Sequence, residues 1–375
     1  MLRIRRTAAA VVAAAALTGS ALAMATPAFA RTPGSFIGQF SKIKNVASTV
    51  PGNGDVNPYG VAVVRHSEGR LNRGDVLVSN FNNKANQQGT GSTIVEISPG
   101  GHRTVFAHIT KAGLPGPCPG GIGLTTALDI LPGGWVVVGS TPSTNGMAAT
   151  AKAGCLIVLD NQGRVRETIS GHGINGPWDM TAVSFGDRIA ELFVTNVLNG
   201  TVKANGAVVH RGTVLRLIVL LSEQRAPRLL AVTKIGSGFF EKTDPNAFVI
   251  GPTGLGLGRN GTLYVADTGE SRITGIPHAI FRRTSAGTGF VLTSGGHLNA
   301  PLGLAIAPNG DVLTVNAGDG QIVETSPAGV QVAHRFLNTM GSPPGSGALF
   351  GLAVAPQGSG VYFVDDITNF LRLLH

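Results

Sequence analysis

A short polar residue recurs at six places in the sequence, each time at the end of a run of apolar and β-branched residues. The six residues are Asn80, Ser140, Asn196, Asp267, Asn316 and Asp365. Amide and carboxylate oxygens are the ligands that hard cations such as Ca²⁺ and Mg²⁺ prefer. If the six runs surround one axis, the candidate ligands for a metal ion or a small molecule are Asn80, Asn196, Asp267, Asn316 and Asp365.

The same residues also have a purely structural interpretation. Asn and Asp at strand ends commonly hydrogen-bond to backbone groups of the following turn. The sequence leaves both interpretations open. It identifies no firm cofactor, and Ca²⁺ and Mg²⁺ are the candidates.

A second recurring position is partly aromatic. It lies directly before a glycine, or before the residue that replaces that glycine, and it is occupied by Tyr59, Thr126, Trp178, Thr253, Leu302 and Phe350. Aromatic rings at this position either pack between neighbouring repeats or form a floor on which a sugar or an apolar ligand stacks. The residues of this set that we predict to bind a ligand are Tyr59, Thr126, Trp178, Thr253 and Phe350.

Two carboxylates interrupt otherwise apolar runs. Asp179 stands where the repeat pattern expects glycine, and Asp129 lies inside an apolar run. A buried carboxyl group needs a hydrogen-bonding partner or a shifted pKa. Asp179 is the candidate catalytic base, although both carboxylates could instead satisfy turns.

These positions recur because the sequence itself repeats. Residues 300–329 contain an apolar run, a Pro-Asn-Gly turn, a second run, a small-residue loop and a third run. Such runs, bounded by Gly, Pro, Asn and Ser, predict antiparallel strands. The pattern occurs six times between residues 57 and 374. Six repeats of about four strands predict an all-β fold, a six-bladed β-propeller, whereas a two-sheet sandwich does not explain the number six.

The last repeat is one strand short. Residues 35–40 form a lone strand candidate, so we expect this N-terminal segment to complete the last blade and close the ring. In the fourth repeat, the expected third and fourth strands are residues 279–282 and 289–293.

The repeated phrase Pro-x-Gly-Leu-x-Val-x-Pro-x-Gly-x-Leu-x-Val-x-Asp resembles the NHL repeat. Residues 251–267 and 300–316 carry it best, and repeats two and three carry it weakly. The resemblance implies a six-bladed propeller that is distantly like lactonase-type and lyase-type propellers. Relatives of this kind include peptide and protein binders as well as metal-dependent enzymes, so the resemblance does not settle the activity.

The longest loops are expected on one face of the propeller. Strand direction alternates within a blade, so the loops before the first strand and between the second and third strands share a face. In blades one to three the second kind of loop is long, at residues 81–91, 141–154 and 197–212. Binding residues concentrate on such loops, and we therefore expect the ligand over blades one to three.

The two cysteines, Cys118 and Cys155, both fall on that face in blade two. In an exported protein, two cysteines predict a disulfide. The alternative is a pair of buried free thiols.

The first 30 residues resemble a secretory signal peptide. They combine a basic start, a short apolar stretch and the sequence Ala28-Phe29-Ala30. We therefore expect residues 31–375 to form a single propeller domain that is secreted or periplasmic. No later stretch has the length of a membrane span.

The charge distribution argues against nucleic acid as a partner. The formal net charge is +9, and loss of Arg3, Arg5 and Arg6 with the signal peptide lowers it to +6. The remaining positive charges are scattered rather than clustered. We expect a monomer whose partner is a peptide, a saccharide or a protein.

Two functions fit these observations. The first is a binding module with its ligand at the loop-rich face. The alternative is a metal-assisted hydrolase or lyase with a divalent cation at the propeller axis. The sequence alone does not decide whether the protein is an enzyme.

Overall fold

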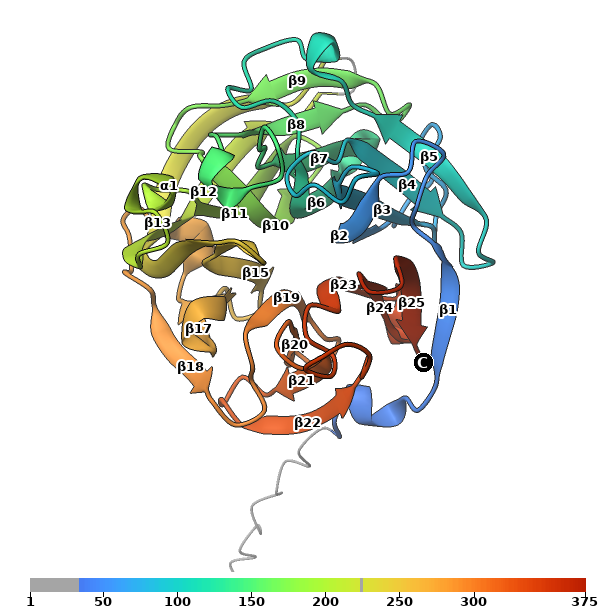
Figure 1. Cartoon of the computed structure of the whole chain (residues 1–375), viewed down its shortest axis with the longest axis vertical. Coiled ribbons are helices and arrows are strands. Elements are labelled where there is room, and N and C mark those ends of the chain that lie inside the picture. The colour runs from blue at the N-terminus through green and yellow to red at the C-terminus, as the bar shows by residue number, and fades with distance from the viewer. Residues whose placement is uncertain (1–33, 223–224) are drawn as a thin grey trace, which may run out of the picture. The chain divides into compact units, whose positions relative to one another are not determined.

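The computed structural model describes residues 34–222 and 225–375. The predicted signal peptide, residues 1–30, lies outside this range. Across the described residues, the strands form six antiparallel sheets arranged as the blades of a propeller (Figure 1). The predicted six-bladed β-propeller is therefore confirmed. No helix in the described part of the chain is long and apolar enough to cross a membrane.

The first three blades follow one another in chain order. Blade one contains β2 (Val56–Val63), β3 (Val76–Asn82), β4 (Thr93–Ile97) and β5 (Arg103–His108). Blade two contains β6 (Leu124–Leu131), β7 (Trp135–Ser140), β8 (Cys155–Leu159) and β9 (Val165–Ile169). Blade three contains β10 (Gly176–Phe185), β11 (Ile189–Val197), β12 (Val209–Leu220), β13 (Arg228–Asp244) and β14 (Phe248–Ile250).

The remaining blades have four strands each. Blade four contains β15 (Pro252–Leu257), β16 (Leu263–Asp267), β17 (Arg272–Ile276) and β18 (Phe290–Ser294). Blade five contains β19 (Pro301–Ile306), β20 (Val312–Asn316), β21 (Gln321–Thr325) and β22 (Gln331–Phe336). Blade six contains β23 (Leu349–Val354), β24 (Val361–Asp365), β25 (Phe370–Leu374) and the N-terminal β1 (Ile43–Ser48).

Among residues 34–222 and 225–375, helical structure is confined to short turns in the loops. The α-helix α1 spans Thr201–Ala204 in the long loop of blade three. The 3-10 turns are Ile37–Gln39, Lys111–Gly113, Pro132–Gly134, Ala148–Thr150, Thr268–Glu270, Ala279–Phe281 and Pro356–Gly358.

The first strand of each blade lies at the axis and contacts the first strands of the neighbouring blades. Every one of these strands has a β-bulge near its start, for example between Pro58 and Val61 in β2 and between Pro177 and Met180 in β10. A bulge leaves residues without a partner across the ladder and turns their side chains in a new direction. In all six blades the bulge falls on the partly aromatic position identified in the sequence.

The ring is closed by an N-terminal strand, but not by the predicted residues. β1 pairs antiparallel with β25, so that Ile43 lies opposite Leu374. Figure 1 shows the blue β1 beside the red β25. Residues 35–40, predicted to be this strand, contain a 3-10 turn instead. β1 was missed because it is largely exposed, with Lys and Asn among its residues, and so lacks the apolar run that marks a buried strand.

A second correction concerns blade four. Its third strand is β17, whereas the predicted segment, residues 279–282, contains a 3-10 turn. β17 begins where Arg272 forms an ion pair with Asp267 at the end of β16. It ends before Pro277, which has no backbone N–H to continue the ladder. A strand of only five residues with an internal glycine is a weak signal in sequence.

Glu324 on β21 fastens the N-terminal segment to blade five. Its carboxylate accepts hydrogen bonds from the Phe36 and Ile37 backbone N–H groups at 2.7 and 2.8 Å, and from Ser35 Oγ at 2.7 Å. Burial acts to raise the pKa of Glu324, but these hydrogen bonds hold it below its usual value. Phe36 and Ile37 are buried beside the core of blades five and six. One carboxylate therefore anchors the segment that leads into β1.

Replacing this carboxylate should weaken the closure of the ring. A Glu324→Gln side chain keeps one acceptor oxygen but turns an amide donor toward backbone N–H groups. We expect the free energy of unfolding to fall by about 1–3 kcal/mol, measured by urea denaturation. Glu270→Gln, at an exposed glutamate, is the matched control and should leave stability unchanged. Equal stability of both variants would contradict the anchoring role.

The predicted disulfide between Cys118 and Cys155 is confirmed, with the Cα atoms 5.2 Å apart. It ties the loop before β6 to the start of β8 and closes a separation of 37 residues. In the chain-entropy view such a link stabilises the folded state by about 4 kcal/mol, although measured values are often smaller.

Removing the disulfide should destabilise the protein without unfolding it. We expect the Cys118→Ala/Cys155→Ala double variant to lose about 2–4 kcal/mol of unfolding free energy. Denaturation with and without a reductant provides the control, because only the wild-type protein should respond to the reductant. A wild type that is indifferent to reduction would refute this contribution.

Candidate functional site

Residues from five of the six bulges line a hollow at one mouth of the propeller. We call it the mouth hollow: it has a volume of about 410 Å³ and is lined by residues that include Asn57, Tyr59, Asn82, Trp178, Thr253, Phe350 and Asp366. Four of the five residues predicted from the partly aromatic position therefore lie at one site. The fifth, Thr126, lines a different cavity.

The hollow rests on a cluster of aromatic rings. Tyr59 stacks on Phe350 with ring centroids 4.2 Å apart, and it contacts Trp178 edge-on at 5.8 Å. Phe81 and Phe248 extend the cluster behind them, with Phe81 5.6 Å from Trp178. Tyr59 and Trp178 are buried, whereas Phe350 is partly exposed. The cluster packs neighbouring blades together, which is one of the two predicted roles, and it also lines the hollow. Stacking of a ligand on these rings stays a prediction.

The long loops of blades one to three do not themselves enclose the site. The loop of blade two packs on that of blade one, where the Ser143 N–H donates to the Gly89 carbonyl at 2.8 Å. Phe248, from the segment leading into blade four, inserts beside Phe81. Besides the blade-one loop, the hollow is lined by the β13–β14 segment of blade three, at residues Asn246, Ala247, Val249 and Ile250. Loops of blades four, five and six also line it, including residues Thr268, Gly318 and Asp366. Blades one and three therefore contribute to the hollow, and a ligand over blades one to three stays a prediction.

Asp366 is the charged group of the mouth hollow. It follows Asp365 at the end of β24 and is partly exposed. Burial, and then the neighbouring Asp365, raise the pKa of Asp366 to about 7. The charge of Asp366 in turn adds to burial in raising the pKa of Tyr59 well above its usual value. Asp366 directly follows Asp365 in the sequence, and it was not predicted as a site residue.

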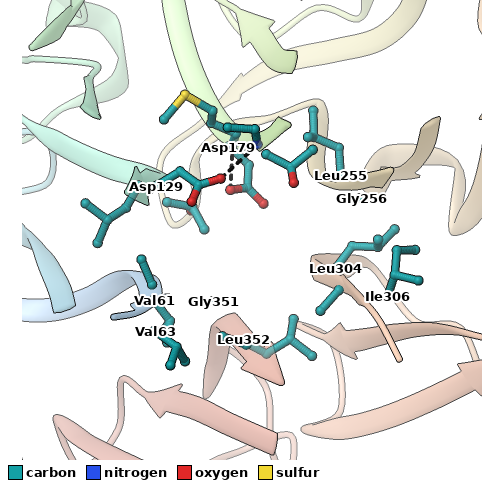
Figure 2. Close-up of a pocket in the computed structure, with 18 of the residues that line it drawn as sticks. Val61, Val63, Asp129, Asp179, Leu255, Gly256, Leu304, Ile306, Gly351 and Leu352 are labelled. Atoms are coloured by element: carbon teal, nitrogen blue, oxygen red, sulfur yellow. Dashed lines mark hydrogen bonds between the residues drawn. The ribbon is translucent and has the colours of Figure 1, made fainter. Parts of the chain in front are cut away.

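A second cavity of about 340 Å³ lies on the axis (Figure 2). We call it the axial cavity: it is lined by first-strand residues beyond the bulges, including Val61, Asp129, Asp179, Leu255, Leu304 and Leu352. Figure 2 shows both carboxyl groups on one side of the cavity, facing the side chains of Leu304 and Leu352. The predicted candidates Asp129 and Asp179 are therefore brought together in a largely apolar space.

Hydrogen bonds hold these two carboxyl groups in place. The Ile130 and Ala182 N–H groups donate to Asp129 at 2.8 Å each, which links blades two and three. The Met180 N–H donates to Asp179 at 2.7 Å. Burial raises the pKa of Asp129 to about 6. Burial and the charge of Asp129 raise the pKa of Asp179 well above its usual value. Asp179 therefore holds its proton to higher pH than an ordinary aspartate does. Its role as a catalytic base stays a prediction.

The two cavities have no lining residue in common. The axial cavity instead shares Arg65 and Asp129 with a hollow of about 610 Å³ that is also lined by His66, Glu68 and Asp187. Asp187 lies in the turn between β10 and β11, on the face opposite the mouth. The two carboxyl groups are therefore not part of the mouth hollow.

The predicted polar ring does not meet at the axis. Among its members, Asp267 pairs with Arg272 at 2.8 Å and Asp365 pairs with Arg372 at 2.8 Å. Asn196 accepts hydrogen bonds from the Asn175 and Gly176 N–H groups at 2.7 and 3.1 Å.

The other members behave in the same way. Asn80 donates to the Thr49 carbonyl at 3.1 Å, and Asn316 donates to the His297 carbonyl at 2.7 Å. Ser140 donates to the Gly121 carbonyl at 2.8 Å. Each member is thus engaged with nearby backbone or side chains, as the turn-capping interpretation describes.

These residues do not fit a divalent cation at the axis. Asn80, Asp267 and Asn316 each retain a buried oxygen without a hydrogen-bond partner, but they belong to separate blades. None of the five candidate ligands lines the mouth hollow or the axial cavity. The described residues also contain no cluster of three His, Cys, Asp or Glu residues that could hold a metal ion.

Comparison with solved structures places the fold among lactonase-type and lyase-type propellers. A gluconolactonase from Xanthomonas campestris is 14% identical, with 87% of this chain and 88% of that chain covered and a TM-score of 0.53. The calcium-binding regucalcin from Agrobacterium tumefaciens is 13% identical over 88% and 93% of the chains, with a TM-score of 0.54. A streptogramin B lyase is 13% identical over 89% and 97%, with a TM-score of 0.51.

These likenesses confirm the expected distant similarity to such propellers. At identities this low they show a shared fold and no shared activity. No family model matches the chain, and no curated protein matches it by sequence. Membership of the NHL-repeat family therefore stays a prediction.

The axial carboxyl groups should make stability depend on pH. Asp129 and Asp179 have ordinary pKa values near 3.8 when unfolded. In the fold the pKa of Asp129 rises to about 6, and that of Asp179 is also raised well above its ordinary value. The folded state binds more protons in this interval, so stability falls as pH rises through it, by up to about 3 kcal/mol for Asp129.

Asp129→Asn and Asp179→Asn mimic the protonated forms. In urea denaturation from about pH 4 to pH 8, each variant should gain stability relative to wild type as pH rises. Other carboxyl groups with raised pKa values are common to all three proteins and cancel in the comparison. Parallel pH profiles would contradict the assignment.

Proposed function

We propose that the protein is a binding module whose ligand occupies the mouth hollow. The observation that supports this best is the hollow itself, a space of about 410 Å³ in which aromatic residues lie beside amide, hydroxyl and carboxyl groups. Ligand sites generally combine such an apolar surface with a few polar groups that fix orientation. The volume suits a small molecule or one unit of a peptide or saccharide chain.

The rigidity of the surroundings supports the same proposal. Residues 59, 178, 253 and 350 occupy bulges in four different first strands. Their positions are therefore set by the propeller scaffold, and not by the long loops. A preformed hollow costs little ordering entropy when a ligand binds.

The alternative, a metal-assisted hydrolase or lyase, has less support. Its support is that a gluconolactonase and a calcium-binding regucalcin have the same fold as this chain. In this chain, however, the candidate metal ligands are engaged within their own blades and line neither cavity. We therefore assign no catalytic step to a metal ion.

Export to the periplasm or the medium is part of the proposal. The disulfide between Cys118 and Cys155 suits an oxidising compartment. We further propose a monomer that binds a peptide, a saccharide or a protein segment, and not nucleic acid.

The proposal is tested with panels of saccharides and short peptides, followed by thermal unfolding. A ligand at one hundred times its Kd adds about 2.7 kcal/mol of stability and so raises Tm by a few degrees. Phe350→Ala removes an aromatic residue from the hollow and should abolish the shift for a ligand bound there.

Phe336→Ala is the matched control, because Phe336 is an exposed phenylalanine on the outer strand β22. It should leave the shift intact. A ligand that stabilises the Phe350→Ala variant as well as it stabilises wild type binds elsewhere and would contradict the proposal.

A further inference from the structure

Asp366 carries a carboxyl group without a partner. Its side chain makes no hydrogen bond or ion pair with any described residue, whereas the adjacent Asp365 is paired with Arg372 and also accepts a hydrogen bond from Asn338 at 2.7 Å. Only the backbone of Asp366 forms hydrogen bonds; for example, its N–H group donates to the Ala348 carbonyl. A carboxylate removed from water is costly unless a positive charge or a hydrogen-bond donor faces it.

Two further acceptors at the same hollow are unsatisfied. The Oδ1 atoms of Asn57 and Asn82 are buried without a hydrogen-bond partner, and these side chains are only 7% and 2% exposed. Both residues line the mouth hollow with Asp366. Buried polar atoms are almost always hydrogen-bonded in folded proteins. These two buried oxygens, beside the carboxyl group of Asp366 that no described residue pairs, indicate a ligand that brings donors.

The rest of the lining favours positive charge on that ligand. Among the described residues that line the hollow, Asp366 is the one charged side chain, and there is no Lys or Arg. Tyr59, Trp178 and Phe350 contribute aromatic rings, whose faces attract cations. The hollow is thus acidic in a chain whose formal net charge is +9.

We infer that the mouth hollow recognises an ammonium group on its ligand, with Asp366 as the counter-ion and the amide oxygens of Asn57 and Asn82 as hydrogen-bond acceptors. This inference rests on the proposed binding function and specifies its ligand class. A primary ammonium group supplies three N–H donors together with the charge, so it can donate to both amide oxygens and also pair with the Asp366 carboxylate.

A metal ion is a poorer match for the same groups. Ca²⁺ takes six to eight oxygen ligands, usually with several carboxylates. Here Asp366 is the one free carboxylate, because Asp365 is held by Arg372. The aromatic rings would contribute no ligands to such an ion, whereas they interact favourably with an organic ammonium group.

Binding should depend on the ionisation of Asp366. The titratable groups that face it are Asp365, whose charge helps to raise its pKa to about 7, and Tyr59, whose own pKa lies well above its usual value. Below about pH 7 the empty hollow therefore holds a neutral acid. A bound ammonium group favours the carboxylate, so affinity should fall as pH decreases from about 8 to about 6.

The test uses two probes of nearly equal shape, benzylammonium and benzyl alcohol. Both have a ring, but only the first has a charged group with three donors, and it stays charged from about pH 6 to pH 8. By calorimetric titration at about pH 8 we expect benzylammonium to bind at least about tenfold more tightly than benzyl alcohol.

Variants assign this preference to Asp366. In Asp366→Asn, benzylammonium should bind no more tightly than benzyl alcohol, and its pH dependence should disappear. Asp187→Asn, at an exposed acid on the opposite face, makes the same change in net charge and should preserve both. Because the Asp366 side chain makes no bond with a described residue, its replacement should not unfold the protein, and urea denaturation checks this.

The outcomes separate this inference from the proposed function. If both probes bind equally and Phe350→Ala weakens both, the hollow is a binding site but the ammonium preference is refuted. If benzylammonium binds equally well to Asp366→Asn and wild type, the inference is also refuted. If neither probe binds and the saccharide and peptide panels are negative too, both the inference and the proposed function fall.

Discussion

The close approach of the first strands at the axis is the constraint on which the other features depend. At the bulges of blades four, five and six the chain passes so near the next backbone that a side chain is excluded. A Cβ atom on Gly303 would overlap the Phe350 carbonyl oxygen, and one on Gly351 would overlap the Tyr59 carbonyl oxygen. Glycine is used where backbones must approach this closely. The contact sets the width of the axis and turns the residue before each glycine toward the mouth.

This one arrangement produces two chemically different spaces. On the mouth side of the bulges lie Tyr59, Trp178 and Phe350, and beyond the bulges lie the apolar residues of the axial cavity. Blade three departs from the pattern, because Asp179 occupies the glycine position and sends a carboxyl group into the axial cavity. A change at a packing position therefore brings an acid beside Asp129. The carboxyl group of Asp129 accepts a hydrogen bond from the Ala182 N–H group and so joins blades two and three.

Much of the fold could be predicted because it depends on patterns that recur locally. Six sets of short apolar runs indicated six blades, and an incomplete last repeat required an N-terminal strand. The position of that strand was missed because β1 is an exposed outer strand with little apolar content. The partly aromatic position was predicted correctly as a shared location for Tyr59, Trp178, Thr253 and Phe350. The polar ring did not predict residues that line either cavity, because Asn and Asp at strand ends are equally suited to capping turns and to binding ligands.

By itself, the sequence determined the number of blades, the pairing of the two cysteines and four of the residues that line the mouth, Tyr59, Trp178, Thr253 and Phe350, because each depends on residue type and spacing. Only the tertiary structure decided which polar groups are satisfied. Asp365 and Asp366 are neighbours of the same type, yet Arg372 from the next strand reaches Asp365, and no described residue reaches the carboxylate of Asp366. Hydrogen-bond and ion-pair partners come from strands and loops brought together by folding, so an unpartnered acid cannot be recognised until the ring is closed around it.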